Sequence, residues 1–164
     1  MILRTSSKLV GNTEHFWGLD PGKFGALACV SADGRYISVQ DLPQSDEEWI
    51  DLLQIDYSRP RDYCTLENVH ALPNQSTVAG FTFGKNVGKA ELLAENLSSV
   101  EAPLLVTPQR WKKYFKLDKD KHKSVELARE MFPQAEELLL YSKDGRAEAL
   151  LIAEYGRRYL KGLL

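Results

Sequence analysis

Alternation of apolar and polar residues divides much of the chain into short strand-like segments. Pro21-Gly22 and Asp33-Gly34 separate the first of these segments, and an Asp-Gly pair between two alternating runs is a strong hairpin signal. Because the first three segments follow one another through short turns, we expect them to pair locally in one sheet. The predicted strands are residues 15–20, 25–32, 35–41, 62–67 and 104–106.

Most of the remaining residues carry helical signals. Ser45 and Glu48 have the spacing of a capping box, and Thr107-Pro108 places a capping residue before a proline at the first helical position. Local strands followed by alternating strands and helices predict an α/β fold, with a mixed five-stranded sheet and helices on both faces. The predicted helices are residues 49–54, a run that follows residues 81–88 and ends near 97, and residues 107–115, 121–131 and 145–160.

Length and composition suit one domain. The chain has 164 residues, of which 43% are hydrophobic and 27% charged, as in an ordinary globular protein with a single core. No apolar run approaches the roughly 18 residues that span a bilayer, and the start lacks the apolar core of a signal peptide. We therefore expect one domain over residues 1–164 with a flexible segment at 1–13, no membrane partner, and a cytoplasmic location in a bacterium or a phage-infected host. An organellar location would require a transit peptide that has been removed. Cys29 and Cys64, inside predicted strands, are expected to be buried thiols.

Charge is distributed unevenly along the chain. Residues 107–123 contain seven basic residues and two acidic ones, which is a local charge of +5. Since the net charge is −2, the rest of the chain carries −7. A basic segment in an acidic protein is suited to phosphate, although a solvated helix face would have the same composition. The lysines expected to contact a phosphate backbone are Lys112, Lys113, Lys116, Lys121 and Lys123.

Four acidic residues carry the candidate chemistry. Asp20 and Glu67 each close a predicted strand, and Asp144 and Glu148 are four residues apart at the start of the last helix, on one helix face. Each alone has an ordinary interpretation: a turn residue, a solvated strand end or a helix cap. Gathered at one place, four carboxylates repel one another unless divalent cations neutralise them. They have the right number of oxygen donors for two Mg²⁺ ions, with Mn²⁺ able to substitute, and paired ions suit phosphodiester hydrolysis.

Three motifs resemble the RuvC-type Holliday junction resolvases of the RNase H-like superfamily. They are Gly-Leu-Asp-Pro-Gly at 18–22, Leu66-Glu67, and Asp-Gly-Arg-Ala-Glu-Ala-Leu-Leu-Ile-Ala at 144–153, and the resemblance covers about residues 14–160. It is strongest to the plastid resolvase branch and its phage and bacterial relatives. It implies an RNase H-like fold, with Asp20, Glu67, Asp144 and Glu148 as the metal-binding catalytic residues. It also implies a homodimer that nicks four-way junction DNA symmetrically during recombination.

Two details of this resemblance concern residues rather than fold. The bacterial prototype ends in two aspartates three apart, whereas here an Asp and a Glu are four apart, which leaves open whether Asp144 or Glu148 bridges the metals. The loop at 73–83, which follows Glu67, corresponds to the loop that probes bases at the junction. Its side chains are expected to bind base edges or stack at the crossover, or the two Phe residues anchor the following helix instead. These candidates are Asn74, Gln75, Phe81 and Phe83.

Other functions are compatible with part of this pattern. A different RNase H-like nuclease, which cuts RNA, RNA–DNA hybrid or branched replication DNA, would need the same carboxylates. A noncatalytic nucleic-acid-binding module would be expected to have lost a carboxylate, whereas all four are present. An RNase H-like ATP-binding domain would need Gly-rich phosphate loops and a second domain, which the chain lacks.

Overall fold

The computed structural model describes residues 3–4, 13–54, 61–70 and 76–164. One mixed sheet in the order β1-β4-β3-β2-β5-β6 runs through them. The strands β1 to β4 are antiparallel to their neighbours, whereas β5 is parallel to β2 and β6 is parallel to β5. The strands are β1 (Leu3–Arg4), β2 (His15–Asp20), β3 (Ala26–Ser31), β4 (Ile37–Asp41), β5 (Asp62–Glu67) and β6 (Leu104–Val106).

The predicted α/β class and mixed sheet are confirmed. The five expected strands are present, and the two-residue β1 extends the sheet beyond β4. β1 lies inside the segment 1–13 for which flexibility was expected; residues 1–2 and 5–12 of that segment are outside the described residues.

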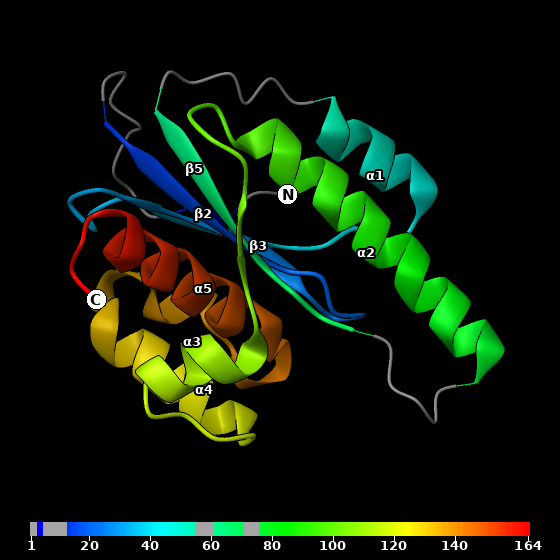
Figure 1. The fold of residues 1–164 in the computed structure, drawn as a ribbon. Coiled ribbons are helices and arrows are strands. Elements are labelled where there is room, and N and C mark those ends of the chain that lie inside the picture. Colours follow the sequence, from blue (N-terminus) through cyan, green and yellow to red (C-terminus); the bar gives the residue numbers. More distant parts are fainter. Residues whose placement is uncertain (1–2, 5–12, 55–60, 71–75) are drawn as a thin grey trace.

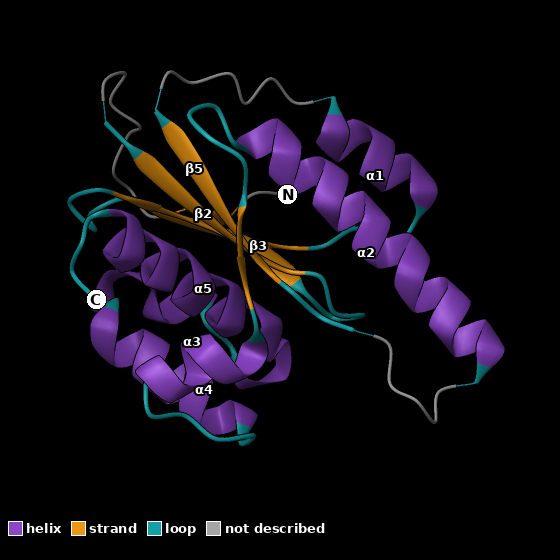
Figure 2. Cartoon of the chain, viewed as in Figure 1, coloured by secondary structure: helices purple, strands orange, loops and turns teal. Residues whose placement is uncertain are grey.

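Helices cover both faces of the sheet (Figures 1 and 2). α1 (Asp46–Leu53) and α2 (Thr77–Leu97) pack on one face, and α3 (Pro108–Tyr114), α4 (Lys121–Met131) and α5 (Asp144–Leu160) pack on the other. Two short 3₁₀ helices that were not expected from the sequence, η1 (Pro133–Leu138) and η2 (Tyr141–Lys143), connect α4 to α5. None of the helices in the described parts of the chain is long and apolar enough to cross a bilayer.

Side-chain alternation in β2 divides the core in two. Phe16 faces the layer of α3, α4 and α5, whereas Trp17 and Leu19 face α1 and α2. The next position on the first side is Gly18, and after it Asp20. Cys29 and Cys64 are buried free thiols, as expected.

α5 lies unusually close to β2. A Cβ atom at Gly18 would be 2.1 Å from the carbonyl oxygen of Ala149 and 2.3 Å from the backbone nitrogen of Ala153. A Cβ atom at Gly145 would likewise be 2.2 Å from the carbonyl oxygen of Phe24, in the turn after β2. Because these glycines have no side chains, the first turns of α5 rest directly on the end of β2.

The start of α2 differs from the prediction. The loop was expected to reach residue 83, but α2 begins at Thr77, after Ser76, whose hydroxyl accepts a hydrogen bond from the Ala79 backbone. Phe81 and Phe83 therefore belong to a helix and not to a loop. The glycines at 80, 84 and 88 lower helix propensity by about 1 kcal/mol each relative to alanine, which obscured the helix in the sequence.

Candidate active site

Two carboxylates lie at neighbouring strand ends. Asp20 ends β2 and Glu67 ends β5, one residue beyond the paired positions Leu19 and Leu66 of these parallel strands. Side chains at matching positions of neighbouring parallel strands point to the same face, here the face that α5 covers. Both carboxylates are buried, with 7% of Asp20 and 8% of Glu67 exposed. The predicted pairing of these two strand ends is therefore present.

α5 supplies two more carboxylates to the same place. Asp144 and Glu148 occupy its first two turns, which rest against the end of β2; Glu148 is buried and Asp144 half-buried. Their negative charges act on Asp20, and the charge of Glu148 also acts on Glu67. The structure thus couples all four predicted acidic residues electrostatically at this end of the sheet.

Crowding and burial change the acidity of the two strand-end groups. Burial, and then the charges of Glu148 and Asp144, raise the pKa of Asp20 to about 6, although the Gly22 backbone N–H and Lys121 oppose this. Burial and the charge of Asp20 raise the pKa of Glu67 to about 7. Because burial and mutual repulsion disfavour the anionic form of these carboxylates, a cation beside them would stabilise it. The cluster is therefore suited to bind cations.

Two lysines provide cations inside the cluster. Lys112 of α3 donates a hydrogen bond to Oε1 of Glu148 at 2.8 Å. Lys121, the first residue of α4, is ion-paired with Oδ2 of Asp144, and its Nζ is 4.0 Å from Oε2 of Glu148. Burial lowers the pKa of Lys121, but the two carboxylates raise it more, so that its net shift is upward. Lys112 and Lys121 were both expected as contacts to a phosphate backbone, and the structure places both against the carboxylates.

A tryptophan positions Glu67. The indole Nε1 of Trp111 donates a hydrogen bond to Oε1 of Glu67 at 2.8 Å, and Trp111 is completely buried. The Thr107 cap and Pro108 start α3 directly after β6, which places this ring beneath the end of β5. The sequence did not predict this hydrogen bond to the site; the available signal was a Trp directly before the Lys112-Lys113 pair.

Lysines pair with two of the four carboxylates, and the carboxylates do not have the geometry of metal ligands. Among the described residues, no three Asp, Glu, His or Cys side chains are grouped closely enough to hold a metal ion. The donor chemistry nevertheless fits Mg²⁺, since all four acidic side chains offer carboxylate oxygens. Metal binding by this set would require Lys112 and Lys121 to release Glu148 and Asp144.

The other predicted DNA-binding residues lie in different surroundings. Lys113 is exposed on α3, Lys116 is exposed in the segment that follows α3, and Lys123 is exposed but ion-paired with Asp118. Phe81 is 71% exposed on α2, and Phe83 is half-buried. Asn74 and Gln75 lie outside the described residues.

Arg146, which lies between Asp144 and Glu148 in the sequence, pairs with Asp41 and not with Asp144. Its guanidinium forms two hydrogen bonds to Asp41 at the end of β4, at 2.7 and 3.0 Å, and a third to the carbonyl oxygen of Leu138. Lys143 also pairs with Asp41 at 3.1 Å. These contacts attach the start of α5 to β4, and Asp144 forms its ion pair with Lys121 and not with Arg146.

The raised pKa values predict how the stability of the metal-free protein depends on pH. Asp20 and Glu67 hold their protons more tightly when folded, so the folded state binds more protons than the unfolded state between their ordinary pKa values and about 6 and 7. The free energy of unfolding should therefore fall as pH rises, by a few kcal/mol between about pH 5 and pH 8. Urea unfolding in EDTA across this range measures it, and a flat or rising profile would contradict the shifts.

The comparisons with known proteins give no family assignment. No protein-family model matches the chain, and no curated protein matches it in sequence.

Proposed function

We propose that this protein is a metal-dependent endonuclease with an RNase H-like fold, and that it resolves four-way DNA junctions. The observation that carries the proposal is the meeting of Asp20 and Glu67, from two strand ends, with Asp144 and Glu148, from one helix. Three antiparallel strands followed by two parallel ones, with helices on both faces, are compatible with the fold that the sequence resemblance implies.

The chain's own groups have distinct roles in this proposal. Paired Mg²⁺ ions, if held by the four carboxylates, would supply activation of the attacking water and stabilisation of the leaving 3′ oxygen. Asp20, Glu67, Asp144 and Glu148 hold the ions, and Trp111 orients Glu67 through its indole N–H. Lys112 and Lys121 neutralise the carboxylates before metal enters, and their ammonium groups are then free to pair with the phosphate of the bound strand.

Exposed basic residues beside the site support a nucleic-acid substrate. Lys113, Lys116 and Lys123 are exposed on α3, α4 and the segment between them, the helices that also deliver Lys112 and Lys121 to the carboxylates. Contacts of this kind are independent of base sequence, and they position the sugar–phosphate backbone over the site.

Symmetric cleavage of a junction requires two sites, and α2 offers a surface for a second copy of the chain. Val78, Phe81 and Leu92 are 77%, 71% and 58% exposed, and their spacing places them on one side of this helix. Leu93 and Leu97 of the same helix are buried in the core. We therefore assign the proposed two-fold interface to the exposed stripe of α2.

Cleavage of a set of matched substrates tests the proposed function. With Mg²⁺ or Mn²⁺, we expect paired nicks on opposed strands of a mobile four-way junction, and far slower cutting of a linear duplex of the same sequence. EDTA should stop the reaction. Cut sites mapped on all four strands would show whether the nicks are symmetric, as a dimer requires.

The other outcomes separate the alternatives. Efficient cutting of an RNA–DNA hybrid alone would replace the junction proposal by a different RNase H-like nuclease. Tight junction binding without cleavage in either metal would indicate a noncatalytic binding module.

A further inference from the structure

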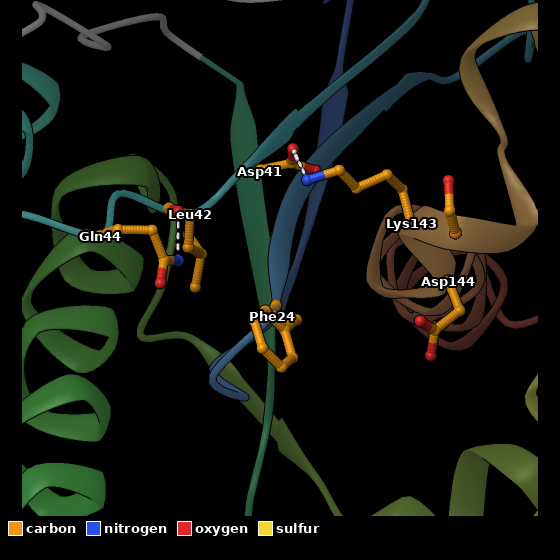
Figure 3. A pocket seen from close by; sticks show the side chains of 8 residues that line it. Phe24, Asp41, Leu42, Gln44, Lys143 and Asp144 are labelled. Atoms are coloured by element: carbon orange, nitrogen blue, oxygen red, sulfur yellow. Dashed lines mark hydrogen bonds and ion pairs between the residues drawn. The ribbon is translucent and has the colours of Figure 1, made fainter.

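A cavity of about 420 Å³ opens beside the carboxylate site (Figure 3). Phe24, from the turn after β2, stands between Leu42 and Gln44 on one side and Asp144 on the other. The volume of the cavity is within the range of cavities that hold small organic groups. Because Asp144 lines the cavity and also belongs to the acidic cluster, any group bound here lies directly beside the candidate reaction centre.

The lining favours a flat, uncharged ring. Phe24 is 74% exposed, and the Lys23 ammonium lies 5.2 Å from its ring centroid, so the opposite face of the ring is the one left for a ligand; Leu42 adds an apolar wall. Asp41 also lines the cavity, but Arg146 and Lys143 neutralise its charge. A ligand with an aromatic face therefore gains stacking area without meeting an uncompensated charge from this wall.

Polar groups at the rim match the edge of such a ring. The side-chain Nε2 of Gln44 donates hydrogen bonds to the carbonyl oxygens of Leu42 at 3.1 Å and Lys23 at 3.3 Å. These bonds fix the amide and leave its carbonyl oxygen as an acceptor, and the Ser142 hydroxyl adds a group that both donates and accepts. Amide and hydroxyl groups beside an aromatic face are the combination that proteins use to bind nucleobases.

We propose that this cavity binds the nucleobase of the nucleotide that adjoins the scissile phosphate, with Phe24 as its stacking surface; this inference rests on the proposed nuclease function. The bound base leaves its stack and enters between Phe24 and the wall formed by Leu42 and Gln44. Base unstacking costs least where pairing is already strained, as at a junction crossover. The cavity thereby links the choice of cleavage position to the shape of the DNA and to the identity of one base.

Abasic substitution tests the cavity through cleavage. The rate is measured on junctions that carry either the normal base or an abasic sugar on each side of the cut position. The unmodified protein should cut one abasic junction roughly tenfold more slowly, the lower range of what one base stacked on an aromatic ring contributes. Phe24→Ala should cut both junctions at the same slow rate, and Phe24→Trp should keep the preference for the intact base.

The results distinguish failure of this inference from failure of the proposed function. If the unmodified protein cuts no substrate in Mg²⁺ or Mn²⁺, the nuclease proposal fails. If it cuts intact and abasic junctions equally on both sides of the cut, only the nucleobase cavity is wrong.

A binding measurement tests the same contact without chemistry. Trp17, Trp49 and Trp111 are buried but also fluoresce, so the signal of the indole introduced by Phe24→Trp is the change in emission that the variant shows and the unmodified protein does not. In Ca²⁺, with the junction left uncut, the emission of this indole should be quenched by DNA with an intact base and unchanged by DNA with an abasic sugar. Equal quenching by the two junctions would overturn the assignment of the cavity.

Discussion

Asp20→Asn should abolish cleavage while it makes the metal-free protein more stable. The loss of one charged ligand at the centre of the acidic cluster removes several kcal/mol of transition-state stabilisation, or about a thousandfold in rate. The same change removes a buried carboxylate whose pKa is raised to about 6 by burial and by Glu148 and Asp144. At pH 8 in EDTA, therefore, the thermal midpoint of the variant should exceed that of the unmodified protein. Junction cleavage rates and thermal unfolding, measured on the same preparations, test both halves.

The opposite signs of these two effects exclude unfolding as the cause of lost activity. Asp62→Asn is the matched control, because Asp62 is a buried carboxylate at the other end of β5, where it accepts hydrogen bonds from Trp17 and His15. This variant should lower stability and leave the cleavage rate of the folded fraction unchanged. Normal cleavage by Asp20→Asn, or equal loss of cleavage by Asp62→Asn, would contradict the assignment of the site.

The acidic site was predictable because each of its parts has a local signal. The apolar runs that end at Asp20 and Glu67 set the strand ends, and strand alternation sets the face to which these side chains point. The spacing of Asp144 and Glu148 sets their helix face. Only the packing of α5 on β2 depends on the complete fold, and Gly18 is the residue of the sequence that allows this close packing.

Contacts between distant segments were not predictable in the same way. The pairing of Lys112 with Glu148, and of Trp111 with Glu67, depends on how α3 lies against the sheet. The sequence showed a basic helix but no direction for its individual side chains. Arg146 illustrates the same limit: its partner Asp41 is 105 residues away, on β4.

Of the features described, the cavity beside the site is the one that the sequence pattern predicts least. Phe24 comes from the connection after β2, Leu42 and Gln44 come from the connection after β4, and Ser142 comes from the short helix η2; none belongs to a periodic motif. Loops of this kind are positioned by the elements that they join, so their convergence is a property of the completed fold. In the sequence, Phe24 is a single apolar residue in a turn.

Gly18→Ala should destabilise the protein severely and separate the two halves of the site. The new methyl group would need to occupy space 2.1 Å from the carbonyl oxygen of Ala149 and 2.3 Å from the nitrogen of Ala153. Both atoms belong to the backbone of α5, so no side-chain rotation relieves the clash and the helix must shift. We expect a loss of about 3 kcal/mol or more in the free energy of unfolding, at the upper end of overpacking costs. Urea unfolding measures the loss, and the remaining folded protein should cleave poorly because Asp144 and Glu148 move with α5.

Gly80→Ala provides the control of the same chemistry at a site without crowding. Gly80 lies in α2, and a Cβ atom there would meet nothing within 4 Å. Alanine should therefore stabilise the protein by up to about 1 kcal/mol through helix propensity. Similar urea midpoints for the two variants would show that α5 does not rest on β2 as closely as the structure indicates. Opposite shifts would support the direct contact through which α5 presents its two carboxylates to Asp20.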